Sequence, residues 1–184
     1  MYDQIIDKIK KDKNKWTQFQ KLFVQREIAS KTILLLEGET ATQIHFIKKG
    51  CIREWFNKDG KDITFQFFFE GQAVASIESF LNSQPSKFTI ESIEPSVILS
   101  ITRKNLEQLY WLFPEFKEGY QEFLFQRFGN YANLFLSRIK DTPRERYADL
   151  VKYHPEIIKR VPQHYIASYL GITPISLSRI RNRK

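Results

Sequence analysis

The chain has few of the side chains that usually hold metals, form disulfides or transfer protons. Cys51 is the only cysteine, and of three histidines only His45 precedes residue 150. A single cysteine forms no internal disulfide and no iron–sulfur cluster, and a metal-dependent enzyme needs several ligands in one place. We therefore expect that the protein binds no metal and no cofactor, has no catalytic residues and is not an enzyme. Cys51 is interpreted as a buried strand residue, with redox sensing as the alternative, and His45 as a structural or surface residue.

Long hydrophobic runs are also missing. The first residues, MYDQIIDKIKKDK, mix acids and bases where a signal peptide would have an apolar core. No uncharged apolar run approaches the roughly 20 residues that span a bilayer. The sequence thus predicts a cytoplasmic protein with no membrane partner.

Acidic residues are absent from position 157 to the end, and the whole chain carries a net charge of +8. The same stretch holds the basic residues Lys159, Arg160, Arg179, Arg181, Arg183 and Lys184. A basic segment of this kind is typical of a surface that binds a polyanion such as nucleic acid. A solvated, frayed tail is the other interpretation that charge alone allows.

Between about residues 30 and 100 the sequence has the texture of short strands. Turn glycines recur every ten to twelve residues, at Gly38, Gly50, Gly60 and Gly71. Evenly spaced turns predict a sandwich or barrel of antiparallel strands.

One hairpin in this region is marked by NKDGKD, because glycine accepts the positive φ of a tight reversal at Asp59-Gly60. In the strand that follows, alternate residues are expected on one face: Ile63, Phe65, Phe67 and Phe69.

Helical patterns flank the β-region, in the first 25 or so residues and after Thr102, which can cap a helix. The longest helix follows Pro114, runs to Lys140 and has two apolar stripes. One stripe is Tyr120, Leu124, Phe128, Tyr131 and Phe135, and the other is Phe125, Ala132, Leu136 and Ile139. A helix that is apolar on two sides must be covered on two sides. We expect one side to pack on the β-region and the other on a second copy, giving a homodimer; burial within one chain is the alternative.

The sequence restarts a helix at DTPRERYADL, directly after the long one. Thr142 and Glu145 form a capping box, with Pro143 at the first helical position. A cap in this place marks a hinge, and we place a domain boundary there.

The stretch IASYLGITPISLSRIR predicts two short helices joined by a tight turn. Gly171 stands where the first helix must end in a left-handed residue, which costs glycine little. Thr173 then caps the second helix, with Pro174 at its first position. Residues expected to lock the two helices together are Ile166, Leu170, Ile172, Leu177 and Ile180, with the small Ala167 where they approach. This pattern predicts a helix-turn-helix.

The second of these helices has a length that suits the major groove of double-stranded DNA. Arg179 can make a bidentate pair with guanine, Ile175 can touch a thymine methyl group, and Ser176 shares their face. Residues better placed for phosphates, which position a protein without specifying sequence, are Thr173, Arg181, Arg183 and Lys184.

In order and spacing, these parts resemble the Crp/Fnr family of bacterial transcription regulators over nearly the whole chain. The glycine-paced run is similar to the family's cyclic-nucleotide-binding β-roll, the helix from Pro114 to Lys140 to its dimerisation helix, and IASYLGITPISLSRIR to its helix-turn-helix. The resemblance implies an α+β fold. A jelly-roll-like antiparallel β-roll is expected in residues 1–113, the dimerisation helix in 114–140 and the helix-turn-helix domain in 141–184. The implied function is that of a homodimeric DNA-binding transcription regulator.

The chain departs from the family where relatives hold a cyclic nucleotide. Their Gly-Glu and Arg-Ser pairs correspond here to Ala75-Ser76 and Ser86-Lys87. Lysine supplies charge but not the guanidinium fork that grips a phosphate, so we expect no binding of cyclic AMP. If an unknown small-molecule effector binds, its pocket is expected at Ala75, Ser76, Ser86, Lys87 and Asn130.

A second departure lies in the recognition helix. Ile175 stands where many relatives have a glutamate that reads cytosine, which implies a different DNA site. The alternative function is a small-molecule-binding β-roll, a sensor or interaction module with a vestigial helix-turn-helix. The acid-free C-terminal stretch favours DNA, because a vestigial helix has no need to exclude acids.

Overall fold

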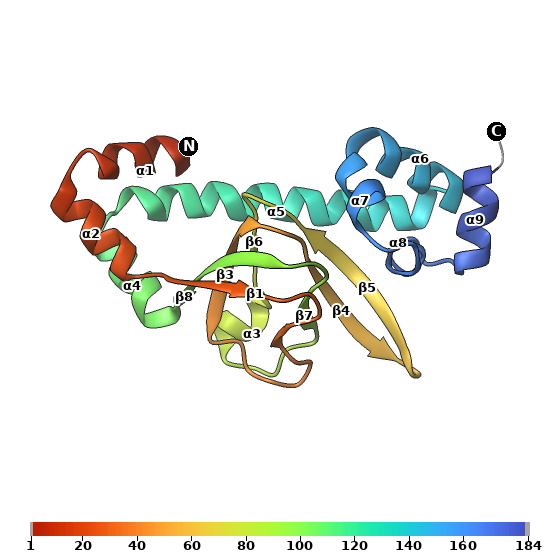
Figure 1. The fold of residues 1–184 in the computed structure, drawn as a ribbon, viewed down its shortest axis with the longest axis horizontal. Coiled ribbons are helices and arrows are strands. Elements are labelled where there is room, and N and C mark those ends of the chain that lie inside the picture. The colour runs from red at the N-terminus through yellow and green to blue at the C-terminus, as the bar shows by residue number, and fades with distance from the viewer. Residues whose placement is uncertain (1, 183–184) are drawn as a thin grey trace.

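The computed structural model describes the backbone of residues 2–182 and the side chains of residues 6–117, 124–125 and 127–182. Within this part, two four-stranded antiparallel sheets enclose the main hydrophobic core (Figure 1). One sheet has the order β1 (Val24–Ile28), β8 (Ser96–Thr102), β3 (Gln43–Lys49), β6 (Ala73–Val74). The other has the order β2 (Ile33–Leu35), β7 (Thr89–Ser92), β4 (Ile52–Lys58), β5 (Lys61–Phe68). The short helix α3 (Ile77–Asn82) lies between β6 and β7 in the chain. The predicted antiparallel β-region is confirmed.

Two of the predicted turns show why the chain needs particular residues there. Strands β4 and β5 form a hairpin whose turn residues Asp59 and Gly60 both have positive φ, 53° and 76°, as the NKDGKD pattern predicts. At Gly50, φ is 107°, and a Cβ would lie 2.0 Å from the Ser96 hydroxyl. Only glycine fits this second turn.

The prediction that four alternate residues along β5 share one face is wrong, because a β-bulge divides them. The pairing of β4 with β5 shifts register at a β-bulge beside Glu54, where Phe65 is the extra residue. Phe67 and Phe69 join a cluster with the C-terminal helices, whereas Phe65 stacks on Phe88 with ring centres 4.9 Å apart. A bulge inserts one residue and reverses the alternation beyond it, so Ile63, which pairs with Phe56, and Phe65 lie on the face opposite to Phe67 and Phe69.

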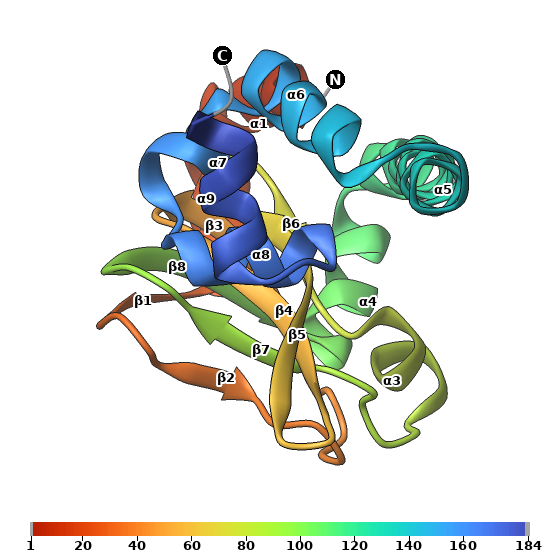
Figure 2. The same ribbon diagram turned by 90° about the vertical axis from the view of Figure 1, so that its right-hand side faces the viewer.

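Helices before and after the sheets are joined by aromatic packing. They are α1 (Tyr2–Lys10), α2 (Lys13–Lys21), α4 (Arg103–Leu112) and α5 (Glu115–Lys140). The Thr102 hydroxyl accepts a hydrogen bond from the backbone N–H of Asn105, which confirms the predicted cap of α4. Phe19 of α2 stacks on Phe116 of α5, with ring centres 5.6 Å apart. Helix α5 runs along one side of the sheets and on to the C-terminal helices (Figures 1 and 2).

The two predicted stripes of α5 do not divide into one buried and one exposed side. Leu124 and Tyr131 of the first stripe are half-buried, but Phe128 and Phe135 of the same stripe are 74% and 66% exposed. Among the described side chains of α5, the large apolar ones left exposed are Phe125, Phe128, Phe135, Leu136 and Ile139. The side chain of Tyr120 lies outside the described residues. The side that packs on the β-region is therefore narrower than predicted.

The chain continues into four short helices, α6 (Pro143–Tyr153), α7 (Pro155–Arg160), α8 (Gln163–Leu170) and α9 (Pro174–Asn182). The capping box of Thr142 and Glu145 is present as predicted. These helices share a second core with residues at the start of β4 and the end of β5, built from Cys51, Phe67, Phe69, Leu150, Ile157, Val161, Ile166, Ala167, Leu170 and Leu177. Among residues 2–182, no helix has the length and apolarity that crossing a membrane requires.

Candidate nucleic-acid interface and ligand cavity

Helices α8 and α9 are joined by a turn whose special positions are filled as predicted. Gly171 ends α8 in the left-handed conformation, with φ 69°. The Thr173 hydroxyl accepts a hydrogen bond from the backbone N–H of Ser176 at 3.1 Å and caps the start of α9. Leu170 and Leu177 are each 1% exposed. The turn and the apolar contact together fix the position of α9 on α8.

The outer face of α9 carries the residues that the sequence assigns to DNA. Ile175 is 66% exposed, and Arg179 and Arg181 are exposed as well. Thr173 is exposed, whereas Ser176 is half-buried, and its hydroxyl lies 3.0 Å from that of Thr173. Arg183 and Lys184 lie outside the described residues.

One arginine of the basic stretch is engaged within the protein. Arg160 donates two hydrogen bonds of 2.8 Å to the Glu70 carboxylate and also contacts Glu94. Hydrogen bonding from Arg160 lowers the pKa of Glu70 to about 2. Arg160 therefore joins α7 to the β-region. The number of basic residues in a segment does not show which of them pair within the protein and which are free to contact DNA.

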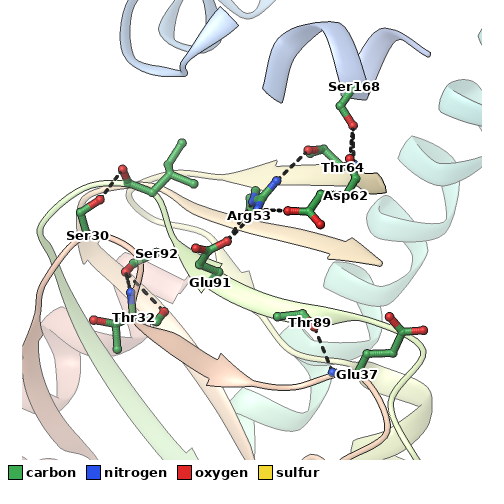
Figure 3. A network of polar contacts seen from close by, with 11 residues as sticks. Ser30, Thr32, Glu37, Arg53, Asp62, Thr64, Thr89, Glu91, Ser92 and Ser168 are labelled. Atoms are coloured by element: carbon green, nitrogen blue, oxygen red, sulfur yellow. Dashed lines mark hydrogen bonds and ion pairs between the residues drawn. The ribbon is translucent and has the colours of Figure 1, made fainter. Parts of the chain in front are cut away.

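Helix α8 is hydrogen-bonded directly to the edge strand β5. The Ser168 hydroxyl accepts from the backbone N–H of Thr64 at 2.9 Å and donates to the backbone C=O of Asp62 at 2.8 Å (Figure 3). This contact uses backbone groups that an edge strand leaves unpaired.

Beside this contact lies a buried arginine. Arg53 of β4 is 1% exposed and donates to the Glu91 carboxylate from Nε at 3.1 Å and from Nη2 at 2.8 Å (Figure 3). Its guanidinium also lies 3.8 Å from the ring centre of Tyr165 on α8 and 4.8 Å from that of Trp55. Paired with a carboxylate and stacked on two rings, the buried charge is compensated.

A cavity of about 950 Å³ lies between the β-region and α5. Its walls are mostly apolar, and the residues that line it are Glu54, Phe65, Ala75, Ser76, Ile77, Glu78, Ser79, Pro85, Lys87, Phe88, Leu124, Phe125, Arg127, Phe128 and Tyr131. A volume of this size and a wall surface that is mostly apolar, with polar groups set into it, are typical of small-molecule sites.

Glu54 is the most deeply buried acid of this lining, at 3% exposure. Burial raises the pKa of its carboxyl to about 7, and the charge of Arg127 opposes the shift only in part. The Arg127 guanidinium donates to the Tyr131 hydroxyl at 2.9 Å and lies 4.6 Å from the ring centre of Phe68. Glu54 therefore ionises near neutral pH in largely apolar surroundings.

Three of the five residues predicted for an effector pocket line this cavity. Ala75 and Ser76 are buried beside the start of α3, and Lys87 lies at the exposed rim, 2.6 Å from the Glu78 carboxylate. Ser86 is buried but is not part of the lining, and its hydroxyl donates to the backbone C=O of Phe88 at 2.7 Å. Asn130 is exposed on α5 and is likewise not part of the lining.

The two side chains considered for metal or redox chemistry are both buried. His45 is 4% exposed, with Nδ1 2.8 Å from the Ser100 hydroxyl, and burial lowers its pKa to about 4. Cys51 is fully buried next to β4, and burial raises the pKa of its thiol. Within the described part of the chain, no three or more His, Cys, Asp or Glu side chains are grouped so that they could hold a metal ion.

Sequence reasoning missed Arg53 and Glu54, which are adjacent in CIREWFN. Consecutive strand residues point to opposite faces, so burial of both requires cover on both faces of β4. The cover comes from α8 on one face and from the wall of the cavity on the other. Charged residues in a strand usually indicate exposure to solvent. No local signal in the sequence could have shown that these two are buried.

Comparison with known proteins defines the class of the β-region. Residues 25–110 match the family model of the cyclic nucleotide-binding domain. A comparison with curated proteins gives no match. The matched segment runs from β1 into α4 and contains both sheets.

Solved structures extend the likeness to the helices. The regulator CLP from Xanthomonas campestris, described as c-di-GMP responsive, matches with a TM-score of 0.72 and 15% identity over 89% of this chain and 87% of that one. FixK2 from Bradyrhizobium japonicum gives 0.71 and 18% over 88% and 83%. A protein from Eubacterium rectale described as a transcriptional regulator of the Crp/Fnr family gives 0.70 and 16% over 92% and 81%. At these identities the likeness establishes the fold, which is that of the Crp/Fnr regulators.

Proposed function

We propose that the chain is a transcription regulator that binds double-stranded DNA as a homodimer, with α9 in the major groove. The observation that carries the proposal is the outer face of α9. Ile175, Arg179 and Arg181 are exposed there, Leu177 is buried against α8, and no acidic residue follows Glu156 in the chain. A rigidly mounted helix with an acid-free, basic face suits both the phosphates and the base edges of a groove.

Within α9 we assign different roles to the exposed residues. Arg179 and Ile175 lie four positions apart and so share a face, which suits base edges, with Ser176 beside them. Arg181 is turned away from that face and suits phosphates. Thr173 lies at the start of the helix, where backbone N–H groups favour an anion.

The homodimer is supported by the apolar side chains exposed on α5. Phe125, Phe135 and Ile139 are each at least 66% exposed, and a contiguous apolar face of this kind is unusual in a monomer. A second copy of α5 packed on this face would also cover the cavity on the side where Phe125 and Phe128 line it. A two-fold dimer would present two copies of α9 to a palindromic site with half-sites about 34 Å apart.

We further propose that the cavity is the effector site and that it does not take cyclic AMP. Lys87 is paired with Glu78 at the rim, and the Ser86 hydroxyl is bonded to its own loop. A buried phosphate needs a paired cation; Ser86 carries no charge, and Lys87 is already paired with Glu78. The proposed organisation keeps residues 1–113 as the effector-binding domain, 114–140 as the dimerisation helix and 141–184 as the DNA-binding domain, in a protein that acts in the cytoplasm.

Fluorescence anisotropy with a labelled random duplex between 50 and 200 mM salt tests the proposal. We expect binding that weakens steeply with salt, because neutralised phosphates release counterions. The double variant Arg179→Ala/Arg181→Ala should lose most of the affinity for the duplex, whereas Lys104→Ala on α4 should keep it. A protein that binds no duplex even at 50 mM salt would instead support the alternative, a sensor with a vestigial helix-turn-helix.

A further inference from the structure

We infer that the cavity between β4, β5 and α5 binds an arylalkylamine, an aromatic ring that carries an aliphatic ammonium group, and that Glu54 is the residue that recognises this ammonium. This inference rests on the proposed function, in which the cavity is the effector site. It follows from the position of one buried carboxyl, the rings around it and the engagement of the neighbouring cations.

The position of Glu54 leaves its carboxyl available to a ligand. It lines the cavity and is 3% exposed, and the adjacent Arg53 points to the opposite face of β4, where it is bonded to Glu91. A buried carboxylate is costly unless it is paired and hydrogen-bonded. A ligand ammonium would supply both the charge and the donors.

Aromatic rings dominate the wall next to Glu54. The β-bulge turns Phe65 into the cavity, where its ring lies 4.9 Å from the Phe88 ring centre and 5.8 Å from that of Tyr131. Phe125 and Phe128 of α5 also line the cavity. Rings attract both a ligand ring and a cation held over their faces, so a ligand with an aromatic body and an ammonium group suits this wall.

The cations near the cavity do not favour an anionic ligand. Arg127 is hydrogen-bonded to the Tyr131 hydroxyl and lies over the Phe68 ring, and Lys87 is held by Glu78 at the rim. A ligand carboxylate or phosphate would have to break one of these contacts and would meet the like charge of Glu54.

The pH dependence of binding follows from the same groups. Among the side chains that the structure describes, the charged and titratable ones that line the cavity are Glu54 from β4, Glu78 from α3, Lys87 from the segment before β7, and Arg127 and Tyr131 from α5. Burial raises the pKa of the Glu54 carboxyl to about 7. An aliphatic ammonium stays protonated to about pH 10, so an amine should bind more tightly as Glu54 ionises.

The test is isothermal titration calorimetry of the full chain with tryptamine, indole-3-acetate and cyclic AMP. The first two probes share a ring and differ in the sign of their charge. We expect tryptamine to bind at least about tenfold more tightly than indole-3-acetate at pH 8, and more tightly at pH 8 than at pH 6. Glu54→Gln should lose this preference, whereas Glu107→Gln, the same change at an exposed position of α4 that does not line the cavity, should keep it.

Several results would overturn the inference: equal or tighter binding of indole-3-acetate or cyclic AMP, tryptamine affinity unchanged in Glu54→Gln, or no binding of tryptamine. If Glu54→Gln does not fold, the wild-type pH series decides, because affinity that is flat or falls from pH 6 to 8 excludes Glu54 as the partner. Duplex binding without probe is measured in parallel. Failure of tryptamine with intact DNA binding rejects this inference alone, and loss of DNA binding rejects the proposed function.

Discussion

The guanidinium of Arg53 on β4 lies 3.8 Å from the ring centre of Tyr165 on α8. Glu54, the next residue, lines the cavity on the other face of the same strand. One strand thus contacts both the proposed effector site and the helix that supports α9. A shift of β4 on ligand binding would reach α8 through Arg53 without any intermediate element.

Removal of Arg53 should destabilise the fold, because the buried carboxylate of Glu91 would lose its partner. Arg53→Ala should lower the free energy of unfolding by about 3–5 kcal/mol, since Glu91 is 7% exposed and would lose its partner. Urea unfolding measures the change. Arg144→Ala, which removes an exposed arginine of α6, should stay within about 0.5 kcal/mol. A loss under 1 kcal/mol for Arg53→Ala would contradict the buried pair.

The hydrogen bonds of Ser168 should hold α8 on β5. Ser168→Ala leaves the backbone N–H of Thr64 and the C=O of Asp62 without this partner, at a cost of about 1–3 kcal/mol. Amide hydrogen exchange should be faster at Thr64 in the variant. Ser178→Ala, at an exposed position of α9, serves as the control, and unchanged protection of Thr64 would mean that α8 does not rest on β5 in solution.

How far the sequence alone predicts this molecule depends on whether a signal is local. The caps at Thr102, Thr142 and Thr173 and the turn at Gly60 are fixed by neighbouring residues, and the structure has them as predicted. The turned side chain of Phe65 depends on a register shift against a partner strand, which no local pattern reveals.

The same distinction holds for the candidate site. The exposed face of α9 follows from helical spacing, but the cavity is assembled from segments between Glu54 and Tyr131 in the sequence. The burial of Arg53 and Glu54 and the engagement of Arg160 by Glu70 likewise depend on contacts distant in the sequence. Charge patterns do not report such contacts.

The raised pKa of Glu54 predicts how stability changes with pH. Burial raises this pKa from 4.5 to about 7, so the folded state holds the proton more tightly than the unfolded state does. Below pH 4.5 this group should not change the free energy of unfolding. Its contribution should fall as the pH rises from 4.5 to 7, and above pH 7 the free energy of unfolding should be about 3 kcal/mol lower than at pH 4 on account of this group. Glu54→Gln should remove this fall in urea unfolding measured from pH 4 to 8, and Glu78→Gln should not. The same slope in wild type and Glu54→Gln would contradict burial of the ionisable group.

The exposed face of α5 predicts the oligomeric state. Replacing both Leu136 and Ile139, which are 51% and 68% exposed, with glutamate should place charges in the interface of the proposed dimer and give monomers. Sedimentation velocity at micromolar concentration measures the change, with Lys104→Glu on α4 as the control. A wild-type chain that sediments as a monomer would refute the dimer.

Selection of bound sequences from a random duplex pool tests the central claim, DNA recognition by α9, most directly. The wild-type chain should enrich a palindromic site. Arg179→Ala should lose the base preference at one position of each half-site, which should weaken the free energy of binding to the selected site by about 1–3 kcal/mol. Arg181→Ala should bind all sequences more weakly and lower the salt slope by about one unit, because it loses a phosphate contact. A pool without enrichment, or an Arg179→Ala variant that keeps every base preference, would contradict the assignment of α9 as the recognition helix.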